Sequence, residues 1–231
     1  MTGKSWAPVI EAAAGRTPLG DGRFAAPDIR GHGTSSAAQP ITLEAVVGDV
    51  AELISPGATV AGYSMGGRIA LHVALFLGAR VKRLVLIGAS PGIGDARERK
   101  ERRLADERLA EELEQLPIDQ LADRWALHAQ HVLAGQSDRV RALAHADRLR
   151  NEPDALARAL RALGPGALPQ LWDRLGELRM PVVLVVGEHD LKFRLIAEQM
   201  AERIVECRVR VVQGTGHAVH LEAPDAIADE L

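Results

Sequence analysis

The stretch "TVAGYSMGGRIALHVAL", residues 59–75, places a serine between two glycines where a strand pattern gives way to a helical one. Its first residues are apolar and partly β-branched, and apolar side chains recur at helical spacing over residues 66–77. Ser64 stands at the junction, in the G-x-S-x-G pattern of a nucleophile elbow. We expect Gly62 and Gly66 to leave room for a sharp turn that a Cβ atom would obstruct. Arg68 follows one helical turn later and brings a cation near the candidate nucleophile.

Short apolar runs and longer helical patterns alternate along the rest of the chain. The runs without strict alternation predict buried strands at residues 24–27, 59–63, 84–87, 182–186 and 209–212. Helical spacing predicts helices at residues 43–53, 66–77 and 194–204. This alternation favours an α/β fold with a mostly parallel sheet and helices on both faces. Residues 95–175 lack a strand pattern, so we expect one domain over residues 1–231 with a helical cap inserted there.

Composition excludes several classes of function. The formal net charge is -3 and aromatic residues make up 3% of the chain, which disfavours a nucleic-acid-binding surface. Cys207 is the only cysteine, so no intrachain disulfide and no thiolate metal cluster can form. The longest apolar runs are too short to span a bilayer. We therefore expect a cytoplasmic, soluble protein.

An acid and a histidine follow two later strand patterns. Asp190 comes after "PVVLVV" and His217 after "RVRVV", which gives the chain order Ser, Asp, His of an elbow enzyme. A serine hydroxyl needs an imidazole to accept its proton, and the imidazole needs a carboxylate to fix its tautomer. The backbone N–H of Met65, at a helix start, can stabilise negative charge on a substrate oxygen. Singly, Asp190 could be a helix cap and His217 a loop residue, but their order favours a triad.

The other histidines have simpler explanations. His128 and His131 have a spacing compatible with metal binding, but no third ligand accompanies them, so we expect solvated helix positions. His220 follows His217 by three residues and is expected to pack. We predict neither a metal site nor a cofactor.

Several segments together resemble a known family. Within the α/β-hydrolase superfamily, the 2-succinyl-6-hydroxy-2,4-cyclohexadiene-1-carboxylate synthases of menaquinone biosynthesis have similar segments in the same order. The matching segments of this chain are "GYSMGGRIAL", "GASPGI" followed by "RERKERRLADERLAEELE", "LGPGALPQLW", "GEHDLKF" and "GTGHAVHLEAP". The resemblance covers nearly the whole chain. The arginine after the elbow and the Lys-Phe pair after the acid distinguish it from a general esterase.

The resemblance implies a lyase that removes a proton beside a ketone of a polycarboxylate, so that pyruvate leaves without consumption of water. Ser64, activated by His217 and Asp190, then acts as a base. A substrate with several carboxylates calls for fixed cations, and guanidinium groups bind carboxylates in bidentate geometry. The substrate-binding residues implied are Tyr63, Met65, Arg68, Arg102, Trp125, Arg148 and Lys192.

Alternatives remain open for some of these residues. Arg102 lies in a charge run that could be a solvated helix face. Arg150 could serve in place of Arg148, and Lys192 could be an ordinary surface lysine. A carboxylester hydrolase would use the same triad through an acyl-enzyme. A non-enzymatic binding protein of this fold usually loses triad members, whereas this chain keeps all three.

The start "MTGKSWAPVIEAA" departs from the family pattern. In the family a strand and a His-Gly-Phe-like turn precede a tryptophan like Trp6, and this chain begins inside the following loop. We therefore expect the second oxyanion donor and one central strand to be missing. Judged by usual strand and loop lengths, about 15 to 30 upstream residues would supply them.

Overall fold

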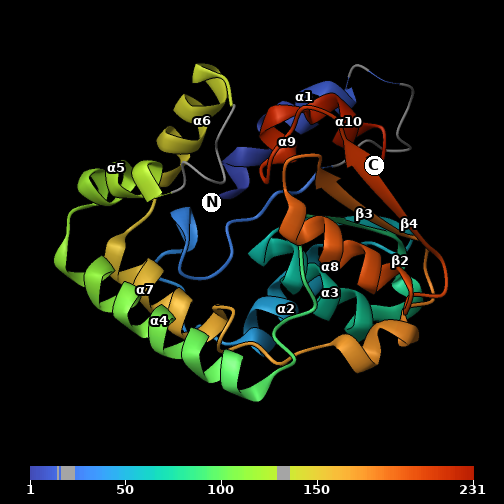
Figure 1. Cartoon of the computed structure of the whole chain (residues 1–231), viewed down its shortest axis with the longest axis horizontal. Helices are drawn as coiled ribbons and strands as arrows, with labels where there is room; N and C mark the ends of the chain where they lie inside the picture. The colour runs from blue at the N-terminus through green and yellow to red at the C-terminus, as the bar shows by residue number, and fades with distance from the viewer. Residues whose placement is uncertain (15, 17–23, 129–135) are drawn as a thin grey trace.

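The computed structural model describes residues 1–14, 16, 24–128 and 136–231. Its sheet is parallel, with the strand order β1-β2-β3-β4 (Figure 1). The strands are β1 (Ala58–Tyr63), β2 (Val81–Ile87), β3 (Val182–Gly187) and β4 (Cys207–Val212). Tyr63 pairs with Ile87, and Gly187 pairs with Val212, so these strands end at one edge of the sheet. The four strand predictions from residue 59 onward and the parallel α/β architecture are confirmed.

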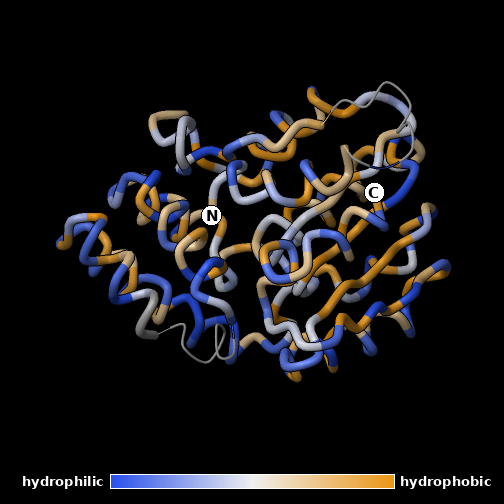
Figure 2. Tube along the Cα trace, turned by 90° about the horizontal axis from the view of Figure 1, so that it is seen from above, coloured by the Kyte–Doolittle hydropathy of each residue, from blue (hydrophilic) through white to orange (hydrophobic). Residues whose placement is uncertain are grey.

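Alternating side chains of the strands separate two apolar layers. On β2, Leu84 and Leu86 belong to one buried cluster, and Val85 and Ile87 belong to another. This period of two places the two sets on opposite faces of the sheet. All six residues of β3 are buried, which explains their continuous apolar run. Figure 2 shows apolar residues concentrated along the central strands and hydrophilic ones along the outer helices.

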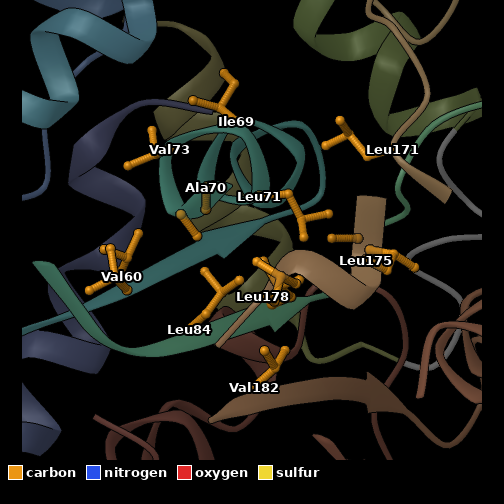
Figure 3. Packing of buried hydrophobic residues seen from close by; sticks show 14 of the residues in the cluster. Val60, Ile69, Ala70, Leu71, Val73, Leu84, Leu171, Leu175, Leu178 and Val182 are labelled. Carbon is orange, nitrogen blue, oxygen red and sulfur yellow. The ribbon is translucent and has the colours of Figure 1, made fainter. Parts of the chain in front are cut away.

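Helices cover both faces of the sheet. On one face, helices α2 (Leu43–Leu53), α3 (Met65–Leu77) and α8 (Leu191–Ala201) contribute to the larger cluster. Figure 3 shows Leu71 of α3 near Leu84 of β2 within this cluster. On the other face lie α1 (Ala7–Ala14), α9 (Val219–Glu222) and α10 (Pro224–Ala228). The three-layer arrangement fixes the carboxyl ends of the strands, from which the site is built.

The described part of the segment between β2 and β3 contains four α-helices, α4 (Ala96–Gln115), α5 (Ile118–His128), α6 (Asp138–Arg148) and α7 (Pro153–Leu163). No strand occurs in the described part of this segment. Helices α4 and α7 pack against each other around a small cluster that includes Leu113 and Ala157. The four helices gather on the left of Figure 1, away from β3 and β4. Short 3₁₀ helices complete the described secondary structure, at Gly3–Trp6, Gly33–Ser35, Gly78–Arg80 and Trp172–Glu177.

The strand predicted at residues 24–27 is wrong. These residues belong to no strand, and Phe24 is 38% exposed. Pro27 has no N–H to donate to a neighbouring strand. Both this segment and β1 line the cavity described below, and among the described residues β1 pairs with β2 alone. β-like composition alone does not make a strand, because a strand also needs a hydrogen-bonding neighbour.

Candidate active site

Ser64 occupies a sharp turn between β1 and α3. Its φ of 50° and ψ of -110° make it the one described non-glycine residue with a positive φ. A Cβ atom on Gly62 would come within 2.4 Å of the Gly66 carbonyl oxygen, so this glycine is required, as expected. The expectation for Gly66 is wrong, because a Cβ there would meet open space. The second close approach is at Gly67, where a Cβ would lie 2.5 Å from the Ala89 side chain.

Ser64, His217 and Asp190 form a continuous hydrogen-bonded chain. His217 Nδ1 lies 2.6 Å from Asp190 Oδ2, and His217 Nε2 lies 3.3 Å from Ser64 Oγ. With the carboxylate accepting from Nδ1–H, Nε2 is left as the acceptor for the serine hydroxyl. The His217 and Asp190 side chains are only 13% and 11% exposed. The structure therefore brings together the three residues selected from the sequence.

The imidazole of His217 lies against Gly88 and Phe193, neither of which was predicted from the sequence as a site residue. Gly88, directly after β2, has a φ of 52°, and a Cβ there would lie 2.8 Å from His217 Cε1. The Phe193 ring lies 4.5 Å from the His217 ring, measured between centroids. A glycine immediately after the apolar run "LVLI" was the available signal. Gly88 thus allows the histidine ring to approach the end of the sheet.

Tyr63 and His220 pack beneath the triad. The His220 ring lies 4.1 Å from the Tyr63 ring and 5.6 Å from the Trp6 ring, and neither of its nitrogens has a partner in the described structure. Burial lowers the pKa of His220 to about 3, so the ring is neutral at neutral pH. Burial also raises the pKa of Tyr63, which keeps its phenol protonated. His220 therefore packs, as its sequence position led us to expect.

Arg68 is a buried cation beside this chain of residues. Its side chain lies on α3 and is 6% exposed, and within the described residues it makes no hydrogen bond or ion pair. Burial, together with the nearby positive charge of Arg102, lowers the pKa of Arg68 to about 10. The guanidinium remains charged at neutral pH. Buried charges are normally paired, so the arrangement points to an anionic ligand.

Two further arginines line the same cavity, whose volume is about 1220 Å³. Arg102, on α4, donates from Nε to Asp106 at 2.7 Å. Arg148, the last residue of α6, lies 5.9 Å from the Trp125 ring, and its buried Nη1 has no partner among the described groups. Burial lowers the pKa of Arg148. Ser64 and His217 line this cavity too, so cations and triad share one space.

The remaining predicted site residues are divided between the cavity and the surface. Met65 begins α3 and lines the cavity, and the first N–H groups of a helix have no acceptor within it. Trp125 lines the cavity while 44% exposed. Arg150 and Lys192 are exposed and are not brought to the cavity. The ammonium group of Lys192 lies 5.9 Å from the Phe193 ring.

Within the described residues no cluster of three or more histidine, cysteine, aspartate or glutamate side chains could hold a metal ion. Only the backbone of His128 is described, and His131 lies outside the described residues. Of the helices that the structure describes, none has the length and apolar character needed to cross a membrane.

The serine turn, the triad and the parallel sheet define an enzyme built like an α/β hydrolase. A sequence profile of the alpha/beta hydrolase family matches residues 1–230, and the chain belongs to this family. A Salmonella paratyphi C protein named 2-succinyl-6-hydroxy-2,4-cyclohexadiene-1-carboxylate synthase is 34% identical over 209 residues, or 88% of this chain and 80% of the relative. A Bacillus subtilis protein provisionally given the same name is 33% identical over 217 residues, covering 89% and 78% of the two chains.

Solved structures agree with this assignment. MenH from S. aureus superposes with a TM-score of 0.80 and 30% identity, covering 88% of this chain and 79% of that one. An esterase from Thermogutta terrifontis also gives a TM-score of 0.80, at 22% identity and with coverage of 100% and 84%, a likeness that concerns the fold alone. Within the alpha/beta hydrolases, the chain thus belongs with the 2-succinyl-6-hydroxy-2,4-cyclohexadiene-1-carboxylate synthases.

Proposed function

We propose that this protein is a carbon–oxygen lyase of menaquinone biosynthesis. It eliminates pyruvate from a cyclohexene polycarboxylate to give 2-succinyl-6-hydroxy-2,4-cyclohexadiene-1-carboxylate, the product in its relatives' name. The observation that carries the proposal is the buried, unpartnered Arg68 in the same cavity as Ser64. A site for neutral esters has no need of a desolvated cation, whereas a polycarboxylate substrate supplies its counter-ion.

In the proposed mechanism Ser64 acts as a base. His217 Nε2 accepts the hydroxyl proton, Asp190 stabilises the imidazolium that results, and the serine oxygen takes the proton beside the substrate ketone. The electron pair forms a carbon–carbon double bond, and the carbon–oxygen bond to the departing group breaks. The oxygen of that group takes the proton from the His217 imidazolium, so pyruvate leaves in its enol form and Ser64 and His217 regain their starting protonation states. The N–H of Met65 supports the negative charge that develops on the ketone oxygen. Water takes no part.

The arginines bind and orient the substrate in this proposal. Arg68, Arg102 and Arg148 each offer a planar set of donors that matches a carboxylate. Their positions on α3, α4 and α6 place cations from three different elements along one cavity. Trp125 and Tyr63 supply aromatic surface beside them. Fixing several carboxylates at once holds the reacting carbon near the serine.

The domain organisation and location belong to the same proposal. Residues 1–231 act as one domain, in which helices α4 to α7 form a cap over the cavity, since residues from α4, α5 and α6 line it. We also retain the cytoplasmic location expected from the sequence, which cell fractionation with an antibody to the protein tests.

The experiment that tests the function is a continuous absorbance assay of pyruvate release from the pathway intermediate. The lyase proposal requires turnover with one pyruvate released per diene formed. The hydrolase alternative is tested in parallel with a chromogenic carboxylester, for which an acyl-enzyme gives a burst equal to the enzyme concentration. A burst with the ester and no release of pyruvate would replace the lyase by an esterase.

A further inference from the structure

A buried carboxylate lies behind the arginines of the cavity. Asp106 of α4 is 4% exposed and does not itself line the cavity. Its Oδ1 accepts from Arg102 Nε at 2.7 Å, and its Oδ2 accepts from the Gly166 N–H at 3.0 Å. Both carboxylate oxygens therefore have a donor, one from the site and one from the chain after α7. Neither the family assignment nor the proposed mechanism gives Asp106 a role.

The bond through Nε controls the direction of the Arg102 guanidinium. A guanidinium is planar, so the bond at Nε fixes the plane of the group and with it the directions of the two terminal nitrogens. Within the described residues those nitrogens have no hydrogen-bond partner, and Arg102 lines the cavity. The negative charge of Asp106 also raises the pKa of Arg68, opposing the effect of Arg102. Asp106 thus orients the Arg102 guanidinium and offsets the repulsion between Arg68 and Arg102.

The turn at residues 164–166 keeps this carboxylate in place. A Cβ atom on Gly166 would lie 2.5 Å from the Arg103 backbone nitrogen, and one on Gly164 would lie 3.0 Å from Asp106 Oδ2. The turn therefore packs directly against α4. Because Asp106 and Gly166 lie 60 residues apart along the chain, the bond between them joins the first helix of the helical segment to the turn after its last helix.

We propose that Asp106 is a positioning residue that sets the affinity of the site for substrate carboxylates. It fixes the plane of the Arg102 guanidinium at the wall of the cavity and permits Arg68 and Arg102 to lie close together. The inference rests on the proposed function, since it concerns the same site. It predicts an effect on binding rather than on the chemistry at Ser64, which Asp106 does not contact.

The test is Asp106→Asn in the full chain. An asparagine has one acceptor oxygen for two donors, so the bond to Arg102 or the bond to Gly166 is lost. We expect KM for the elimination substrate to rise roughly tenfold, as for loss of a charged hydrogen bond, with kcat changed by less than about twofold. Calorimetric titration with 2-oxoglutarate, a keto dicarboxylate probe, should weaken by a similar factor.

Two controls separate positioning from a structural role. Glu101→Gln breaks the exposed Arg97–Glu101 pair on the same helix, with the same spacing of four residues, and should change nothing. In an Arg102→Ala background, Asp106→Asn should have no further effect on KM, because the residue that it positions is gone. Thermal unfolding of each variant reports any loss of fold separately.

Three results would overturn the proposal. Unchanged or tighter binding in Asp106→Asn would mean that the carboxylate merely competes with the substrate. If Asp106→Asn raised KM equally in the wild-type and the Arg102→Ala backgrounds, the effect would come from the 164–166 turn and not from Arg102. The proposal would also fail if the wild-type protein bound no dicarboxylate. Failure of the function itself gives a different result, namely wild-type protein that binds 2-oxoglutarate but releases no pyruvate.

Discussion

Arg68 lies one helical turn after Ser64, and its buried guanidinium lines the cavity that the serine hydroxyl enters, without a hydrogen-bond partner among the described residues. A nucleophile turn alone is compatible with many reactions. The cation beside it, which has no partner among the described residues, favours reactions of anionic substrates, because a desolvated charge is costly unless a ligand neutralises it.

Replacing Arg68 should weaken catalysis. In Arg68→Ala we expect kcat/KM for pyruvate elimination to fall. The fall should correspond to a loss of roughly 2 to 4 kcal/mol in transition-state stabilisation, the range for removal of a buried charged partner. Arg97→Ala, on an exposed surface of α4, is the matched control for loss of one positive charge. If both variants behave alike, Arg68 is not a substrate ligand.

The buried charge of Arg68 should lower the free energy of unfolding, although the same charge supports activity. Arg68→Met keeps much of the side-chain volume and removes a buried charge that lacks a partner in the described structure. Such replacements are often neutral or stabilising, so we expect the free energy of unfolding to stay equal or rise while activity is lost. Urea denaturation at pH 7.5 measures this. A clear loss of stability would show that Arg68 has a structural partner.

Gly88 should be required for the position of His217. Gly88→Ala places a Cβ 2.8 Å from His217 Cε1, so we expect at least about a tenfold loss of kcat as the ring is displaced. Gly78→Ala is the control, because Gly78 has nearly the same φ, 53°, but open space around it. Both variants should lose about 1 kcal/mol of stability from backbone strain. If the two variants were equally active, Gly88 would not be required for the position of His217.

Acid should destabilise the protein partly through His220. Its pKa is about 3 when folded against an ordinary value of 6.5, so the unfolded chain takes up a proton first as the pH falls. The stability is therefore complete above pH 6.5 and declines as the pH falls from 6.5 toward 3. In His220→Leu this part of the decline should disappear. Urea midpoints at pH 7.5, 6.0 and 5.0 test it, and parallel curves for the two proteins would contradict it.

The strands and the triad were predictable because their signals are local. A buried strand such as β3 is apolar throughout, and each triad member stands in the short loop or turn directly after a strand. The predictions that were wrong concern features that depend on residues distant in the sequence. Residues 24–27 have strand-like composition but no pairing neighbour, and whether Gly66 or Gly67 is needed depends on Ala89.

Asp106 illustrates the same limit within the site. Its spacing from Arg102 is visible in the sequence, but it stands in a run of charged residues that looks like a solvated helix face. It is buried because the turn at residues 164–166 packs over it, a contact that no local pattern encodes. Lys192 shows the reverse case, since a residue implied by resemblance lies exposed, away from the cavity.

Pyruvate release by Ser64→Ala tests the central claim most directly. The serine hydroxyl is the proposed base, so its removal should lower kcat by about 10³-fold or more, as in other triads, with thermal unfolding unchanged. The assay is the continuous absorbance measurement with the pathway intermediate, run beside the wild-type protein. A fall of that size in a folded variant is the result that we predict. Turnover near the wild-type rate would contradict the triad mechanism.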